Sequence, residues 1–281
     1  MDKKILLALG CSFTDEHFYS LDSNIPDDKK GPWAMWPELM GKELNLDVVN
    51  FGSGAASNDF IFNKAIQGIA IYGDKIDTLA VLFTSIDRCS YFNTNINVSP
   101  LHILAGANGL IEKQKDLLGY DWEKEIGAYD ATLKYFQSEY CKLRSFEQMI
   151  SNFFGKVLAL VDICNANNIK LVMNQGVEPW RFWITDKLKE GETFKNKDNI
   201  ATELYLCKAL LHNPIFTRLN AYSDKFVGWP IFTALNGSSY SSRYQDRKDL
   251  EVSDRDPHPN KNGQQILANE FLQKYYELYF K

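Results

Sequence analysis

Apolar and polar positions alternate along this chain on two scales. Short, mainly apolar runs are followed by longer stretches in which apolar residues recur at roughly helical spacing. The short runs predict strands at 5–9, 47–51, 78–83 and 169–175. Residues 5–9 show no polar alternation, which suits a strand buried on both faces of a parallel sheet.

The longer stretches predict helices, which lie between and after the strands. They cover 33–46, a segment that opens within 52–59 and runs to about Ile71, 146–168, and a final amphipathic segment from Lys261. Strands that alternate with helices are typical of an α/β fold with a parallel sheet. We therefore expect one domain over residues 1–281.

Two long segments interrupt this alternation, at about 89–146 and 176–250, and we interpret them as insertions. Long loops after parallel strands often shape a substrate pocket. The second insertion holds 226–232, which fits either a short final strand or an apolar lining of a cleft. We expect its tryptophans to be core or interface anchors rather than sugar platforms; these are Trp180, Trp183 and Trp229.

The first apolar run ends abruptly at Gly10, Cys11 and Ser12. Gly10 permits a sharp exit from the strand, which would leave Ser12 exposed at the carboxyl end of the sheet, where sites form in open α/β folds. An ordinary strand-to-loop turn is the alternative, because Ser and Gly are common turn residues.

Near the other end of the chain, His258 lies between two prolines, in a stiff loop. Asp256 and Asp254 precede it by two and four residues. A carboxylate can orient one ring nitrogen while the other acts as a base, as in a Ser-His-Asp triad. The alternative is a solvated loop histidine.

A glycine loop follows the second predicted strand, at 52–59. A dinucleotide fingerprint is disfavoured, because Ser57 stands at the last glycine position and the acidic Asp77 precedes the next strand instead of ending it. The alternatives are that Gly54 offers its backbone N–H to a developing oxyanion, or that it is a plain loop glycine before a helix.

These three segments together resemble the SGNH (GDSL-like) hydrolase family. The resemblance implies a three-layer α/β/α fold with a flavodoxin-like parallel sheet. It also implies a nucleophile at Ser12, a base at His258 and oxyanion donors at the backbone N–H groups of Ser12 and Gly54. Cys11 falls at a position that is not catalytic in the family, so we expect it to be a packing residue.

The resemblance is weak at the family's third block, Gly-x-Asn-Asp. Aligning Asp87 with its Asp places Ile86 at the oxyanion-hole Asn, and an isoleucine side chain cannot donate a hydrogen bond. Substitute donors nearby are Asn58, Thr84 and Ser85, and Arg88 could supply positive charge.

The family's acid also departs from its usual spacing of Asp-x-x-His, which falls here on Arg255. Either Asp256 or Asp254 must therefore serve. We favour Asp256, because a two-residue offset allows a direct bond to the imidazole from a bent loop.

Composition narrows the class of partner. A net charge of −5 with no run of Lys and Arg argues against nucleic acid. Four scattered histidines and no paired cysteines give no metal motif, and no cofactor is expected. His102 and His212 have no partner motif. We expect a small-molecule or glycan ester as the substrate, and the oligomeric state is not predicted.

Five scattered cysteines indicate a reducing compartment rather than a disulfide framework. The apolar run after Lys4 is too short for a signal peptide, and we expect no membrane span. A cytoplasmic protein is therefore expected, with virion association left open.

Two functions remain. The first is a serine ester hydrolase that acts on acyl or acetyl esters, including those of acetylated carbohydrate, through a covalent acyl-enzyme. The second is a catalytically silent SGNH-like module that binds glycans or belongs to a virion. The missing third-block Asn, the displaced Asp and the aromatic insertions favour the second, whereas the retained nucleophile and base favour the first.

Overall fold

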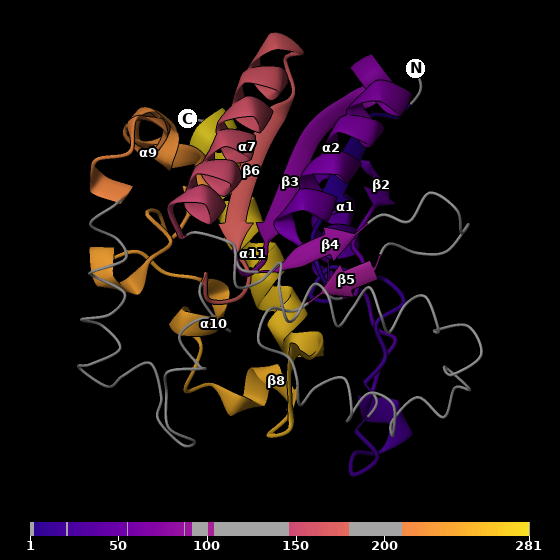
Figure 1. Ribbon diagram of the computed structural model, residues 1–281. Helices are drawn as coiled ribbons and strands as arrows, with labels where there is room; N and C mark the ends of the chain where they lie inside the picture. Colours follow the sequence, from indigo (N-terminus) through magenta and orange to yellow (C-terminus); the bar gives the residue numbers. More distant parts are fainter. Residues whose placement is uncertain are drawn as a thin grey trace.

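A computed structural model of the chain describes residues 3–20, 22–54, 56–86, 88–91, 101–103, 146–179 and 210–280. Its elements follow the predicted alternation of strands and helices (Figure 1). The helices are α1 (Trp36–Leu44), α2 (Asn58–Tyr72), α7 (Phe146–Ala166), α9 (Pro214–Leu219), α10 (Tyr240–Arg243) and α11 (Lys261–Tyr279).

Within these residues the main sheet is parallel and five-stranded, in the order β2-β1-β3-β6-β7. This is the flavodoxin-like order, in which the first strand lies beside the second and third. The strands are β1 (Ile5–Leu9), β2 (Asp47–Asn50), β3 (Ile76–Phe83), β6 (Lys170–Gln175) and β7 (Phe226–Val227).

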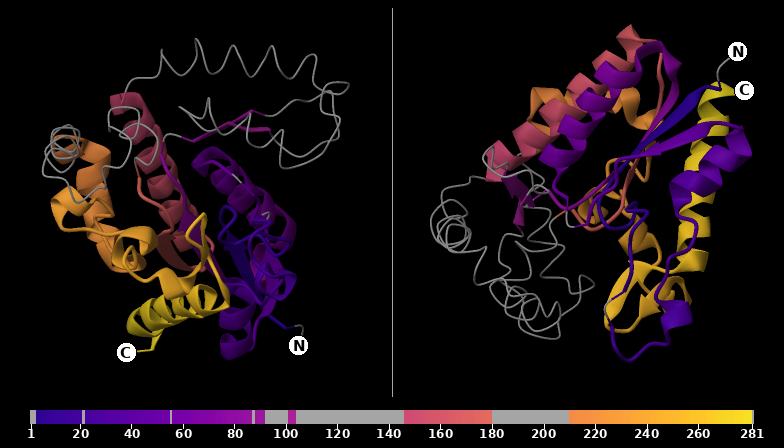
Figure 2. Two further views of the ribbon diagram at one scale, coloured as in Figure 1. Left: turned by 90° about the horizontal axis from the view of Figure 1, so that it is seen from below. Right: turned by 90° about the vertical axis from the view of Figure 1, so that its right-hand side faces the viewer.

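Helices cover both faces of this sheet, which makes the three layers of an α/β/α sandwich. The right-hand view of Figure 2 shows α2 and α7 side by side on one face, and α1 with α11 on the other. Trp36 of α1 stacks on Phe271 of α11 with ring centroids 4.2 Å apart. Every residue of β1 is buried, which explains why that run shows no polar alternation.

The described residues of the second insertion belong partly to the sheet. Phe226 and Val227 pair with Met173 and Asn174, so 226–227 is the edge strand, the first of the two alternatives for 226–232. Trp229 packs on Phe216, with its indole N–H donating to Asn220 at 2.9 Å. It is a packing anchor, as expected, whereas Trp180 and Trp183 lie outside the described residues.

The first insertion begins with a short antiparallel hairpin, β4 (Cys89–Tyr91) with β5 (Leu101–Ile103). Residues 92–100 and 104–145 lie outside the described residues. A second hairpin, β8 (Glu251–Ser253) with β9 (Asp256–Pro259), immediately precedes α11 and carries His258.

Helix α7 bears on the expectation that the chain has no membrane span. Its segment 148–166 has a mean hydropathy of 1.3 and is long and apolar enough, by length and composition, to cross a membrane. Its buried side chains, among them Phe153, Phe154 and Val161, belong to the core cluster under the sheet. The same apolar composition therefore suits a helix that covers a sheet.

Candidate active site

Ser12 lies on a tight turn directly after β1. The Cys11 carbonyl accepts from the backbone N–H of Thr14 at 2.8 Å and of Asp15 at 3.2 Å. A Cβ at Gly10 would lie only 2.0 Å from Oγ1 of Thr14, so this return of the chain requires glycine. The turn leaves Ser12 half-buried while Cys11 is fully buried, as expected for a packing residue.

The turn brings Ser12 against His258, 246 residues away in sequence. Oγ of Ser12 lies 2.8 Å from Nε2 of His258. Nδ1 of the same imidazole lies 2.5 Å from Oδ1 of Asp256. The His258 side chain is 30% exposed and that of Asp256 only 14%, so the base reaches solvent while the acid is shielded.

Asp254 does not share in this contact. It lies exposed in the turn between β8 and β9, whereas Asp256 begins β9 and also accepts from the backbone N–H of His258 at 3.2 Å. Of the two alternatives from the sequence, the structure therefore brings Asp256 to the imidazole.

The second oxygen of Asp256 accepts a hydrogen bond from the hydroxyl of Ser20, a buried residue that the sequence analysis did not single out. Burial raises the pKa of Asp256, but the hydrogen bond and charge of His258, aided by Ser20, outweigh it and hold the pKa below the ordinary value. The carboxylate is thus kept ionised beside the imidazole.

Two rings enclose the imidazole of His258. Phe18 lies across it with centroids 4.5 Å apart and a tilt of 33°, and Phe13 meets it edge-on at 5.4 Å. Phe18 and Ser20 lie in the segment that follows the Ser12 turn, and this segment covers the His258–Asp256 pair. Shortly after it, Asp22 accepts a hydrogen bond from the Ser253 hydroxyl at 2.7 Å.

The oxyanion side differs from the prediction at Gly54. Its backbone N–H donates to Oδ2 of Asp15 at 2.8 Å. Nearby, Asn50 donates to the Thr14 carbonyl at 2.8 Å, and a Cβ at Gly52 would come within 2.6 Å of the Thr14 backbone. The glycine loop is therefore docked onto the Ser12 turn, and its Gly54 donor is already engaged.

Asn58 differs as well. Its amide nitrogen donates to the carbonyls of Thr84 at 2.9 Å and Ser85 at 3.3 Å, and its oxygen accepts from the Thr84 N–H at 3.0 Å. The Thr84 carbonyl also accepts from Gln175 at 2.8 Å. Asn58 thus fixes the loop after β3 and does not present its amide to Ser12.

Two polar groups near this loop are available instead. Leu9, the last residue of β1, pairs with Val81 of β3, so the loops that carry Ser12 and Thr84 leave the sheet at the same edge. Among the described residues, the buried Oγ1 of Thr84 and Nε of Arg88 have no hydrogen-bond partner. A buried polar group without a partner is costly, which makes both candidates for a functional role.

Ile86, at the position of the family's Asn, is buried, and its backbone N–H donates to the Pro179 carbonyl at 2.7 Å. Its side chain supplies no donor, as the sequence indicated. Asp87 lies outside the described residues. The backbone N–H of Ser12 has no acceptor among the described residues, so it stays available for an oxyanion.

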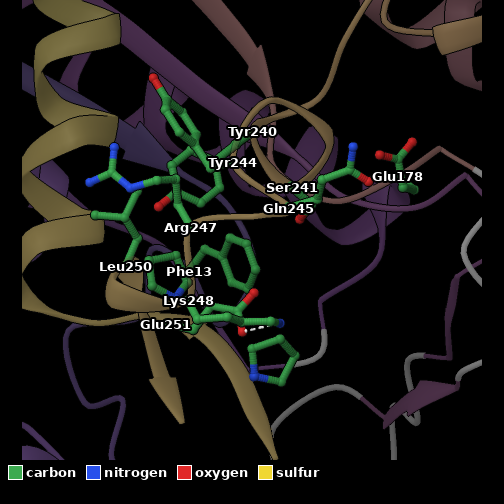
Figure 3. Close-up of a pocket in the computed structure, with 12 residues that line it drawn as sticks. Phe13, Glu178, Tyr240, Ser241, Tyr244, Gln245, Arg247, Lys248, Leu250 and Glu251 are labelled. Atoms are coloured by element: carbon green, nitrogen blue, oxygen red, sulfur yellow. Dashed lines mark hydrogen bonds and ion pairs between the residues drawn. The ribbon is translucent and has the colours of Figure 1, made fainter. Parts of the chain in front are cut away.

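A cavity of about 290 Å³ has Phe13, the residue after Ser12, in its lining (Figure 3). Pro257 and Pro259, which flank His258, also line it, together with Tyr240 and Tyr244. Burial raises the pKa of Tyr240, which keeps the phenol neutral. The cavity combines aromatic walls with the charged side chains of Arg247, Lys248, Glu178 and Glu251.

Within the described ranges, no group of three His, Cys, Asp or Glu side chains could hold a metal ion. His212 is exposed, and the side chain of His102 lies outside what the structure describes. Burial raises the pKa of the Cys164 thiol to about 12. Cys164 is therefore an inert packing residue.

Two side chains that touch the segments of Ser12, His258 and Asp256 were not predicted from the sequence, Ser20 and Gln264. Gln264 immediately follows Gly263 in the first turn of α11, just after the His258 loop. Its proximity to His258 in sequence was the only available signal. Ser20 gave none, because a serine in a polar loop is typical of turns.

No protein-family model matches the chain, and no curated protein matches it. Solved structures that resemble it are a psychrotrophic esterase from Pseudoalteromonas sp., a catalytic mutant of an acetylxylan esterase from Geobacillus stearothermophilus, and a member of the lipolytic protein G-D-S-L family from Veillonella parvula.

These matches are 9%, 12% and 12% identical, with TM-scores of 0.44, 0.44 and 0.39. They cover 99%, 97% and 96% of this chain and 100%, 94% and 97% of theirs, respectively. At this level of similarity, the function of the chain has to be inferred from its own site.

Proposed function

We propose that this chain is a serine ester hydrolase of the SGNH type. The observation that carries the proposal is the continuous hydrogen-bonded path from Oγ of Ser12 through the imidazole of His258 to Asp256. Nucleophile, base and orienting carboxylate at hydrogen-bond distance are the arrangement that activates a serine hydroxyl.

In the proposed reaction, Oγ of Ser12 attacks the ester carbonyl carbon while Nε2 of His258 takes the hydroxyl proton. The imidazolium, held by Asp256, returns that proton to the leaving alcohol as the carbon–oxygen bond breaks. A water molecule then gives a proton to Nε2 of His258 and attacks the carbonyl carbon of the serine ester. The imidazolium returns that proton to Oγ of Ser12 as the acyl–oxygen bond breaks and the acid is released.

The developing oxyanion needs donors at the ends of β1 and β3. The backbone N–H of Ser12 and the hydroxyl of Thr84 are the groups that we assign to it. Gly54 could contribute only if its N–H left Asp15. Arg88, which is 8% exposed, adds positive charge near the same loop.

The substrate class that we propose is an acyl or acetyl ester, with acetylated carbohydrate included because the SGNH resemblance suggests it. Phe13, Tyr240 and Tyr244 line the cavity described above, and their rings would suit a substrate that carries a ring or a short apolar chain. This part of the proposal is tested by comparing acetyl, butyryl and acetyl-sugar esters.

A fluorophosphonate probe tests the proposal directly, because it forms a covalent bond only with an activated nucleophile. The purified protein is incubated with the probe and read by intact mass and peptide mapping. We expect one adduct, on Ser12, which is lost in Ser12→Ala and at least about 10³-fold slower in His258→Ala.

Two matched variants serve as controls. Cys11→Ala removes the buried neighbouring thiol and His212→Ala removes an exposed histidine elsewhere. Both should label at the wild-type rate. Labelling of Cys11 instead of Ser12, or an equal rate in His258→Ala, would contradict the proposal.

A catalytically silent binding module is the second candidate, and the engaged oxyanion side favours it. Gly54 and Asn58 both use their donors within the protein, and Ile86 offers none. A folded wild-type protein that gives no adduct would support this candidate, and binding to glycan arrays would then be the assay.

A further inference from the structure

Gln264, on the first turn of α11, contacts the segments of both the nucleophile and the base. Its side chain is fully buried. The amide nitrogen donates to the carbonyl of Phe13 at 3.1 Å and lies 3.5 Å from the carbonyl of Pro259. Its oxygen accepts from the backbone N–H of Trp36 at 3.0 Å.

The two carbonyls on the donor side belong to the residues directly after Ser12 and His258. The ring of Phe13 also meets the imidazole of His258 edge-on. A shift of the Phe13 carbonyl would therefore move Ser12 and one wall of the imidazole together. The Ser12–His258 contact, which needs a defined distance and direction, depends on this segment.

The packing around Gln264 leaves little room for the two segments to move independently. A Cβ on the adjacent Gly263 would lie 2.5 Å from the Leu250 carbonyl and 2.8 Å from Cβ of Pro259. Asn260 caps α11 and donates to the carbonyls of Asp249 at 2.9 Å and Glu251 at 2.7 Å. The start of α11 is thus fixed to the His258 hairpin, and the hydrogen bond from Gln264 to Phe13 joins it to the Ser12 turn.

We propose that Gln264 is the positioning residue that holds the Ser12 turn at reacting distance from His258. Its effect on rate rests on the proposed hydrolase function. The two halves of the amide have separate roles: the oxygen supports the start of α1, and the nitrogen ties the turn of the nucleophile to the helix behind the base.

Gln264→Glu tests the donor role alone, because it keeps the shape of the side chain and the acceptor for the Trp36 N–H. An ionised carboxylate cannot donate to the Phe13 carbonyl, whereas a neutral carboxyl can. Burial raises a carboxyl pKa, so the change between the two forms should fall within the assay range. We expect labelling at least tenfold slower than wild type at about pH 8, with recovery towards the wild-type rate at about pH 5.

Gln265→Glu is the matched control, because Gln265 is the exposed next residue of the same helix. It adds the same charge and should leave the ratio to wild type near one at every pH. Gln264→Met, which removes both hydrogen bonds without adding charge, should label at least tenfold more slowly with no recovery at low pH. Circular dichroism checks that each variant is folded.

A second readout does not require turnover. Nitrogen-15 NMR of the His258 ring should show a shift of Nε2 when Ser12→Ala removes its partner. In the Gln264→Glu background at about pH 8, the same Ser12→Ala change should leave Nε2 almost unmoved, because the contact has already been lost.

The outcomes separate the two proposals. If the wild type is labelled and Gln264→Glu is labelled at the same rate at about pH 8, the proposed role of Gln264 is wrong, but the proposed hydrolase function is supported. If the wild type is not labelled, the hydrolase proposal is wrong, and the NMR comparison tests Gln264 alone. An equal Nε2 shift in both backgrounds would then contradict the role of Gln264, and a lost shift would support it.

Discussion

The two sides of the strand-end site are built differently. On the side of the proposed nucleophile and base, the polar atoms of Ser12, His258 and Asp256 are paired with one another, and Ser20 donates to the remaining carboxylate oxygen. On the oxyanion side, Gly54 and Asn58 are paired with the protein's own carboxylate and carbonyl groups.

This difference teaches that a motif position alone does not make a donor available. A backbone N–H or side-chain amide at the end of a strand is a strong hydrogen-bonding group, and the fold uses it unless a substrate atom is to take its place. The unpartnered Thr84 hydroxyl is therefore more informative about the oxyanion side than the engaged Gly54 N–H.

The largest expected effect is on the side where Ser12, His258 and Asp256 are paired with one another. Asp256→Asn should lower the rate of ester hydrolysis or fluorophosphonate labelling roughly 10⁴-fold, because the amide favours the wrong imidazole tautomer. Asp254→Asn, four residues before His258 and exposed, is the control and should leave the rate unchanged. An equal loss of rate in the two variants would show that Asp256 does not orient His258.

The next test concerns the proposed oxyanion donor Thr84. Thr84→Val should lower the rate about 100-fold if the hydroxyl donates to the oxyanion. The free energy of unfolding should stay equal or rise by up to ~1 kcal/mol, because a buried hydroxyl without a partner is removed. Urea unfolding and steady-state kinetics measure the two quantities.

Thr78→Val on the same strand is its control. Thr78 is also buried, but its hydroxyl donates to Asp77 at 2.7 Å. It should lose stability and keep its rate constant per folded molecule. A Thr84→Val protein with the wild-type rate would exclude Thr84 from the oxyanion site.

A smaller effect concerns the support of Asp256. Ser20→Ala should lower the rate about fivefold, which corresponds to the loss of one hydrogen bond of ~1 kcal/mol. Without that bond the carboxylate binds a proton and the imidazolium more tightly, so the acid limb of the pH–rate profile should move to higher pH. Ser23→Ala, at an exposed position of the same loop, should change neither the rate nor the acid limb. A lower rate in Ser20→Ala with an unchanged acid limb would show that Ser20 acts only through packing.

The smallest effect is on stability. Because the folded pKa of Asp256 lies below its unfolded value, the ionised carboxylate stabilises the fold above the unfolded pKa of about 3.9. That contribution is lost as the pH falls through the folded pKa. The free energy of unfolding should therefore fall more steeply below about pH 5 in wild type than in Asp256→Asn, and parallel curves would contradict this.

The local sequence pattern predicted β1, β2, β3, β6 and the long helices, but not the two hairpins or the short helices α9 and α10. β1 is an uninterrupted apolar run, β3 and β6 are mainly apolar, and α7 and α11 begin where the helical spacing begins. Burial on two faces dictates such runs whatever lies beside them. The short edge strand at 226–227 was left open between two interpretations, because two residues carry too little periodicity to identify a strand.

By itself the sequence determined the parallel α/β sandwich and the nucleophile and base candidates. Ser12 and His258 stand beside local signals, a glycine exit and two prolines. Only the tertiary structure brought Asp256 rather than Asp254 to His258, engaged Gly54 with Asp15, and placed Ser20 and Gln264 against the segments of Asp256 and Ser12. These contacts join segments far apart in the chain or depend on the bend of a loop, and their geometry leaves no periodic trace in the sequence.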